Sequence, residues 1–154
     1  MLLMVFSCSE ETRYHSIYDI DGYWRSASPL TYRFDIQDSA AYDISCDLRN
    51  SSDYQWSRLF IAYTLRDSAG HLTDSLFLER TLFDPVSGAP EGEAGIGDLY
   101  EQEFPVRTGY RFPGKGRYTV QLVQMMRTDS LTGIVSAGIR IEDRKSTRLN
   151  SSHV

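Results

Sequence analysis

The sequence predicts an all-β fold: a single-domain antiparallel β-sandwich, jelly-roll-like, with about seven or eight strands. Three observations predict it. Apolar and polar residues alternate with period two over many short segments, which is typical of half-buried strands. Turn sequences rich in Gly, Pro, Asn, Asp and Ser separate these segments at regular spacing. Ten of the 154 residues are tyrosines, and aromatic side chains favour pleated sheets.

The expected strands follow one another along the chain. An opening strand is expected over Arg13–Ile20, because the turn pair Asp21-Gly22 follows it. Leu59–Leu65 is apolar on both faces, which indicates a central strand. The remaining strands are expected at Leu30–Ile36, Tyr42–Leu48, Ser75–Leu82, Phe104–Phe112, Arg117–Met126 and Ile134–Ile141. Only Gly97–Gln102 and Thr128–Leu131 leave room for a helical turn.

The longest stretch without alternation is Phe83–Glu103, which contains Pro85, Pro90 and four glycines. A loop of this length in a compact domain is usually either functional or disordered. Because glycines permit tight turns and close backbone approach, we interpret this stretch as an ordered functional loop.

Cys46 stands among the alternating residues Tyr42, Ile44 and Leu48. We therefore expect a small buried core residue at this position rather than a reactive thiol. Cys8 is the only other cysteine, so the sequence predicts no disulfide framework. A domain of about 130 residues buries roughly two thirds of its unfolded surface and needs no such staple.

Motifs for catalysis and metal binding are missing from the sequence. The histidines His15, His71 and His153 are scattered, and no HxH, HExxH or CxxC spacing occurs, so no metal site is predicted. No GxSxG or other catalytic arrangement occurs either, and no catalytic residue, cofactor or small-molecule substrate is assigned. Gly95–Asp98 is rich in glycine but lacks the lysine of a phosphate-binding loop. The net charge of −5 argues against a nucleic-acid partner.

Three aromatic residues are candidate partner-binding residues. Tyr54 and Trp56 lie two apart beside a turn, and Trp24 follows directly on Tyr23. Aromatic rings supply a large contact area in protein interfaces. Such rings also stack on sugars, so a surface lipoprotein with a glycan-binding β-sandwich module is the alternative function. A structural interpretation is open as well, in which the rings cap the ends of the sandwich core.

The start of the chain resembles the end of a bacterial lipoprotein leader. The apolar run Met1–Ser7 closes with a small residue before Cys8, as in a lipobox, where the cleaved chain carries acyl chains such as palmitate on its new N-terminal cysteine. The run is much shorter than the about 20 apolar residues of a membrane span, whereas acyl chains can hold a protein at a membrane. We interpret Met1–Ser7 as a truncated signal peptide and Cys8 as the lipidation site. The alternative is that Met1–Ser7 is the buried start of a domain.

The end of the chain has a different origin. A common sequencing adapter, read in frame, encodes the run from Asp143 to His153 without a mismatch, so this tail is left out of the fold. The expected organisation is therefore a signal peptide over 1–7, an acylated terminus with a short tether over 8–14, and a β-sandwich domain over 15–142. Residues 143–154 are taken as non-native.

Several short segments occur in a fixed order along the chain between Cys8 and Glu142. They are Trp24, Pro29–Ile36, Tyr42–Asn50, Asp53-Tyr54, Asp74–Leu82, Asp84-Pro85, Gly95–Asp98, Phe112–Tyr118, Gln124–Arg127, Leu131–Ile134 and Gly138–Ile141. This ordered set resembles the gliding motility lipoprotein GldH family of Bacteroidetes. Gln55–Leu59 departs from the pattern of that family, as do the extra acidic residues Glu91 and Glu93.

The resemblance implies a non-enzymatic, lipid-anchored accessory protein of the gliding motility and type IX secretion apparatus. Its partners would be a membrane, through the lipid at Cys8, and other envelope proteins of that apparatus. Under this interpretation the contact surfaces are the sheet edges, the loop of Tyr54 and Trp56, and the loop that contains Gly95, Gly97 and Asp98.

The implied location is the cell envelope, on its periplasmic or surface face. Ser9 is not the aspartate that retains lipoproteins in the inner membrane, so the outer membrane is favoured. The acidic pair Glu10-Glu11 resembles the surface-export signal of Bacteroidetes lipoproteins.

Overall fold

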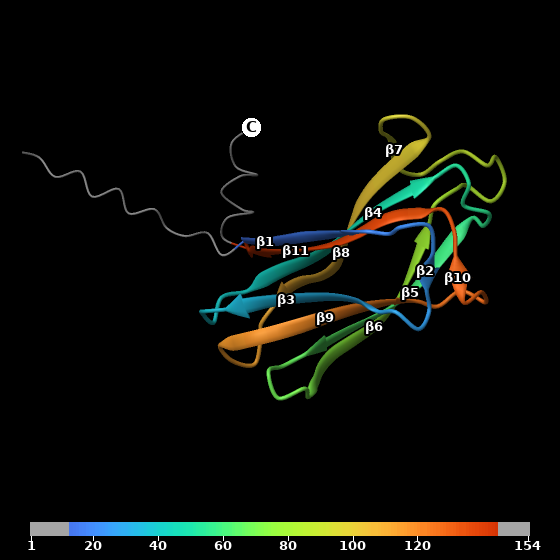
Figure 1. Ribbon diagram of the computed structural model, residues 1–154. Coiled ribbons are helices and arrows are strands. Elements are labelled where there is room, and N and C mark those ends of the chain that lie inside the picture. Colours follow the sequence, from blue (N-terminus) through green and yellow to red (C-terminus); the bar gives the residue numbers. More distant parts are fainter. Residues whose placement is uncertain (1–12, 145–154) are drawn as a thin grey trace, which may run out of the picture.

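The computed structural model describes residues 13–144 and consists of two antiparallel sheets packed face to face (Figure 1). Cys8 and the leader lie outside the described residues, and so does most of the adapter-like tail. Within residues 13–144, no helix is long and apolar enough to cross a bilayer.

Each sheet draws its strands from both halves of the chain. The five-stranded sheet has the order β1 (Arg13–Asp19), β11 (Ile134–Asp143), β4 (Tyr42–Ser51), β8 (Leu99–Tyr110) and β7 (Glu93–Ala94). The four-stranded sheet has the order β3 (Leu30–Ile36), β9 (Gly116–Gln124), β5 (Arg58–Arg66) and β6 (Leu72–Thr81). A two-stranded ribbon pairs β2 (Trp24–Arg25) with β10 (Ser130–Leu131).

The connectivity is that of a jelly roll. Eight of the strands have seven or more residues, and β2, β7 and β10 have two each. Among the long strands, every step along the chain crosses to the other sheet except β5 to β6, which form a hairpin. The first long strand pairs with the last, and the second pairs with the seventh. Two interlocked Greek keys give this order, so the predicted jelly-roll-like sandwich is confirmed.

Alternating side chains of the two sheets meet between them and form one core. The inward residues of β4 are fully or almost fully buried, and those of β5 and β9 likewise. Cys46 of β4 is fully buried, as the alternation predicted, and its burial raises the pKa of the thiol. The predicted central position of Leu59–Leu65 is confirmed as well, because β5 lies between β9 and β6.

Neither segment that the sequence left room for as a helical turn is helical. β8 begins at Leu99, so most of Gly97–Gln102 is strand, and Ser130–Leu131 pairs with β2 instead of coiling. The first half of β8 has two apolar or aromatic residues in a row, Leu99 and Tyr100, followed by three polar ones, so no period of two is visible in its sequence. Pairing with β4, from Ser51 opposite Leu99 onward, fixes it as a strand.

The strand ends differ slightly from the expected domain limits of 15 and 142. β1 begins at Arg13, which pairs with Glu142 of β11. β11 continues to Asp143, which pairs with Tyr42 at the start of β4. The sandwich therefore extends one residue into the segment attributed to the adapter.

Candidate functional site

The predicted contact residues gather at one end of the sandwich. Figure 1 shows β1 beginning and β11 ending at the opposite end, beside the start of β4. The loops over 20–29, 52–57, 82–98 and 125–133 lie at the end away from these described termini, and we call this the loop end.

Tyr54 and Trp56 lie in the loop between β4 and β5 but differ in exposure. The ring of Tyr54 is buried, its hydroxyl donates to the carbonyl of Arg58 at 2.6 Å, and burial raises its pKa. Trp56 remains 41% exposed and packs edge-on against Tyr54 at 5.7 Å between ring centroids. Only the tryptophan therefore offers a ring face to a partner.

A close backbone approach holds this loop against the turn before β11. Gly133 has a positive φ of 90°, and a Cβ there would lie 2.5 Å from the Cα of Tyr54. The amide of Ser51 donates to the carbonyl of Gly133 at 2.9 Å. Only glycine fits this position, because a larger side chain would clash with the backbone of Tyr54.

The loop of Gly95, Gly97 and Asp98 is joined to the loop of Tyr54. The carbonyl of Asp98 accepts from the amide of Ser52 at 3.1 Å, and Gly97 adopts a positive φ of 71°. The intervening Ile96 is 94% exposed. The structure thus brings together the two loops that the sequence proposed as contact surfaces.

The loop after β6 is ordered by an aspartate. The carboxylate of Asp84 accepts from the amides of Ser87 and Val86 at 2.8 and 2.9 Å, and these bonds lower its pKa. The amide of Leu82 donates to the carbonyl of Ser57 at 2.7 Å, which ties this loop to that of Trp56. The side chain of Val86, at 95% exposure, stands at the surface of the loop.

Trp24 is not a contact residue. Its ring is 1% exposed and forms part of the core, so of the two interpretations of this ring the structural one, in which it caps the core, is the one that the structure shows. Tyr54, at 4% exposure, is excluded as a ring platform for the same reason. A stacking surface built from Trp24, Tyr54 and Trp56 does not form, because two of its three rings are inside the protein.

Sequence reasoning missed a buried glutamine that organises this region. The side-chain amide of Gln124 donates to the carbonyls of Thr128 and Trp24 at 2.7 and 3.4 Å, and its oxygen accepts from the amide of Met126 at 2.8 Å. Gln124 is 1% exposed. Its period-two position among apolar residues of β9 was the available signal that it faces the core.

A second surface feature is a groove of about 1030 Å³, bordered by the outer face of the five-stranded sheet and the strand-end loops beside it. Its lining is mostly charged, with an excess of carboxylates, and several of the charged side chains pair with one another. His15 contacts Asp47, and Arg49 contacts Glu101. Partial burial acts to lower the pKa of Arg140, but attraction to Asp47 and Glu103 outweighs it, so the pKa is raised.

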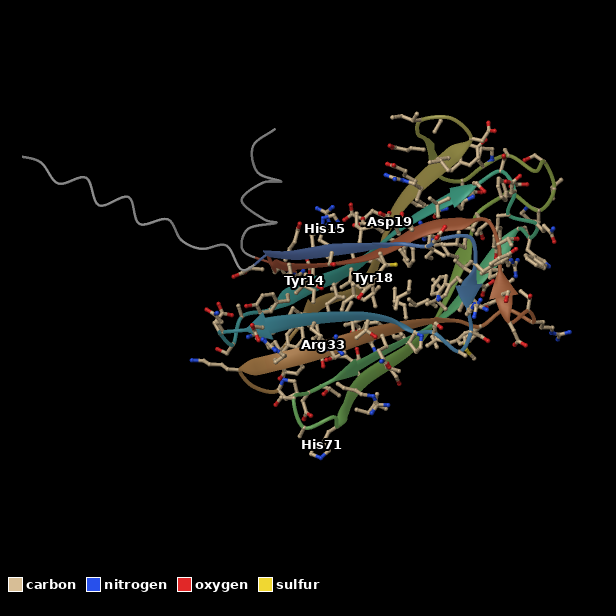
Figure 2. All side chains as sticks on the ribbon, in the orientation of Figure 1. Tyr14, His15, Tyr18, Asp19, Arg33 and His71 are labelled. Atoms are coloured by element: carbon tan, nitrogen blue, oxygen red, sulfur yellow. The ribbon has the colours of Figure 1, made fainter. Side chains whose placement is uncertain are left out.

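His15 and His71, the two histidines within residues 13–144, do not come together. His15 points outward from β1, whereas Tyr14 and Tyr18 point toward the other sheet, and His71 lies at the tip of the β5–β6 turn (Figure 2). Among residues 13–144, no three His, Cys, Asp or Glu side chains are placed to hold a metal ion.

Comparison with known families shows which family the chain belongs to. The model of the family described as GldH lipoprotein matches residues 12–141, which include both sheets. The chain belongs to the GldH lipoprotein family. It is also 28% identical over 152 residues to the gliding motility lipoprotein GldH homolog of Christiangramia forsetii, covering 91% of this chain and 90% of the relative.

Solved structures resemble this GldH chain only loosely. The VP2 protein of infectious bursal disease virus (Gx strain) overlaps with a TM-score of 0.43 at 13% identity, covering 86% of this chain and 32% of the viral chain. A family 35 carbohydrate-binding module from Clostridium thermocellum overlaps with a TM-score of 0.36 at 7% identity, covering 83% of this chain and 87% of the module. No function is inferred from these overlaps.

Family membership establishes the general role. GldH proteins are lipoproteins related to gliding motility, so this chain belongs to the cell envelope and is anchored to a membrane.

Proposed function

We propose that this GldH chain is a non-enzymatic accessory protein of the gliding motility and type IX secretion apparatus, held at a membrane by acyl chains on Cys8. The observation that carries the proposal is the family match over residues 12–141. The proposed location is the outer membrane, on its periplasmic or surface face, because Ser9 follows the acylated cysteine.

The distance between Cys8 and the first strand supports a role close to the membrane. β1 begins at Arg13, five residues after Cys8. Five residues span at most about 18 Å even when fully extended. The lipid would therefore keep the sandwich at the membrane surface, where confinement raises the effective concentration of weakly binding partners.

The chemistry of the described side chains supports a binding role rather than a catalytic one. Cys46 is fully buried in the core, and its raised pKa keeps the thiol protonated and unreactive. Arg140, within the groove on the five-stranded sheet, lies 3.7 Å from carboxylate oxygens of both Asp47 and Glu103. Charges paired in this way stabilise the surface and are poorly placed for acid–base chemistry.

The proposed contact surface for envelope proteins is the loop end. Trp56, Val86 and Ile96 are three of its exposed apolar side chains, and each stands on a loop that backbone hydrogen bonds hold in place. Ordered loops lose little conformational entropy on binding. A surface of this kind suits a protein partner with a complementary apolar site.

The proposal is tested in a gliding bacterium whose native gene is replaced by variants. Cys8→Ala should move the protein from the membrane fraction to the soluble fraction and abolish colony spreading. Trp56→Ala combined with Ile96→Ser should leave the protein in the membrane but reduce both spreading and secretion of a type IX cargo protein. Leu72→Ser, an exposed apolar residue at the opposite end, is the matched control.

The outcomes separate the parts of the proposal. Membrane association of Cys8→Ala would show that the anchor lies elsewhere. Normal spreading and secretion by an abundant, membrane-bound Trp56/Ile96 variant would rule out the loop end as the contact surface. Normal secretion in a non-gliding null strain would remove the type IX role.

A further inference from the structure

The edge strand β6 is open to further pairing. Among residues 13–144, it is the terminal strand of the four-stranded sheet and pairs only with β5. A register shift occurs between Leu65 and Arg66, opposite the start of β6, and the pairing is regular from Asp74 to Thr81. The strand has no proline and no lysine, two of the residue types that usually protect an edge.

The side chains of β6 are incompletely covered on both faces. Phe77 is 62% exposed on the outer face, where it stacks on Phe60 of β5 at 5.7 Å and 24° between the rings. On the inner face, Leu76 and Leu78 pack against the core but remain half-exposed, whereas Leu65 of β5 is fully buried. The sandwich therefore leaves apolar surface uncovered along this edge.

The sequence of β6 is complementary to itself when read in the antiparallel direction. A two-fold axis through Phe77 would place Asp74 opposite Arg80 of a second strand, Ser75 opposite Glu79, and Leu76 opposite Leu78. An axis through Leu76 would instead place Asp74 opposite Leu78 and Phe77 opposite Ser75. Only the register centred on Phe77 matches acid with base, leucine with leucine and ring with ring.

We propose that β6 is a self-association surface, and that a second copy of this chain pairs with it antiparallel in the register centred on Phe77. The four-stranded sheets of the two copies would join into one eight-stranded sheet. The stacked pair of Phe60 and Phe77 would extend into a ladder of four rings, and the half-exposed leucines would be covered. Cross-strand aromatic and opposite-charge pairs of this kind stabilise a sheet. The interface is isologous, as in most homodimers.

The opposing charges are already oriented by the second sheet. Arg107 of β8 donates two hydrogen bonds to Asp74, at 2.8 and 2.9 Å, and Arg80 donates to Gln102 at 2.8 Å while lying over the ring of Phe104. The side chains of Asp74 and Arg80 are therefore held near the edge in fixed positions. The partner's Arg80 would join an acid that is already ordered, so little side-chain entropy is lost.

The first test is sedimentation equilibrium of the full 154-residue chain carrying Cys8→Ser, from about 10 µM to about 1 mM. The chain should form a dimer, and Phe77→Glu should raise the dissociation constant about tenfold or more, because two carboxylates would face each other at the axis. Ile17→Glu is the matched control, because Ile17 is 49% exposed on the edge strand of the other sheet. This variant should associate as the parent does, and circular dichroism confirms that each variant is folded.

The second test fixes the register by mild oxidation of cysteine variants in the same Cys8→Ser chain. Phe77→Cys should cross-link to itself. Ser75→Cys alone should not, but its mixture with Glu79→Cys should. A parent chain that stays monomeric at every concentration would overturn the proposal and leave the edge to a different partner. Equal weakening by Ile17→Glu, or self-cross-linking of Ser75→Cys as fast as that of Phe77→Cys, would overturn it as well.

Discussion

The two long strands on the open side of the sandwich, β8 and β6, protect their edges differently. β7 pairs with the start of β8, and Pro105 lies in the part of β8 that β7 does not cover. The pairing of β8 with β4 also has two register irregularities. β6 has a regular course from Asp74 to Thr81, and within the described part of the chain no strand pairs with its outer edge, although side chains of β8 contact Asp74 and Arg80. Proline, bulges and a covering strand block further pairing, whereas cross-sheet charges only close the gap between the sheets. Side-chain contacts between β8 and β6 can thus close the gap between the two sheets while the outer edge of β6 stays available for pairing.

The largest expected difference between the centre of a sheet and this edge is the reactivity of a thiol. Cys46 on β4 should react with Ellman's reagent at least about a thousandfold more slowly than Phe77→Cys on β6, because a buried thiol reacts only after the fold opens. Both rates are measured in the Cys8→Ser chain, with urea-unfolded protein as the reference. Rapid labelling of Cys46 in the folded chain would contradict its place in the core.

Leucine truncations measure the same contrast in stability. Leu122→Ala in the central strand β9 should lower the free energy of unfolding by about 3 kcal/mol, since the leucine is fully buried and its removal leaves a cavity. Leu76→Ala on β6 should cost about 1 kcal/mol, because water already reaches part of that side chain. Urea unfolding at low protein concentration gives both values. Equal losses would mean that the edge is as well packed as the centre.

The contact between Asp74 and Arg107 tests how the open side is closed. The carboxylate of Asp74 is only 12% exposed and accepts two hydrogen bonds, so Asp74→Ala should cost about 2 kcal/mol. The matched control is Asp35→Ala, whose partner Arg117 is equally charged but whose carboxylate is 55% exposed; it should cost less than about 0.5 kcal/mol. Similar losses in the two variants would show that the cross-sheet pair stabilises the fold no more than the exposed pair does.

The smallest effect is expected in the turn that leads into β6. The amides of His71 and Ala69 donate to the carboxylate of Asp67, and these bonds lower its pKa. A carboxylate with a lowered pKa stabilises the fold above its unfolded pKa of about 3.9, and this stabilisation disappears as the pH falls through the folded value. Asp67→Asn should therefore lower Tm slightly at pH 7, and the difference should shrink below about pH 4. Thermal unfolding across pH checks this, with Ser68→Ala as the control in the same turn.

Much of the fold could be predicted because strand periodicity is local. Tyr42, Ile44 and Leu48 alternate with polar residues, and this alone identified β4 and the buried place of Cys46. The start of β8 could not be predicted, because apolar and polar residues do not alternate over Leu99–Glu103. Pairing with β4, about fifty residues earlier in the chain, holds it as a strand.

The candidate site was predicted in part. The sequence proposed the loops of Trp56 and of Gly95–Asp98 as contact surfaces, and the structure joins these loops through Ser52 and Asp98. It left open whether Tyr54 is exposed or caps the core, because the close approach of Gly133 to the Tyr54 backbone joins residues almost eighty positions apart in the chain.

The sequence by itself determined most of the long strands, the inward face of their alternating residues and the family resemblance that the family match confirmed. These properties depend on period, turn chemistry and the order of short motifs, which neighbouring residues specify. Only the tertiary structure decided which aromatic rings are buried and which strand is left at an open edge. Burial and edge position depend on contacts between residues far apart in the chain, and no local pattern records those contacts.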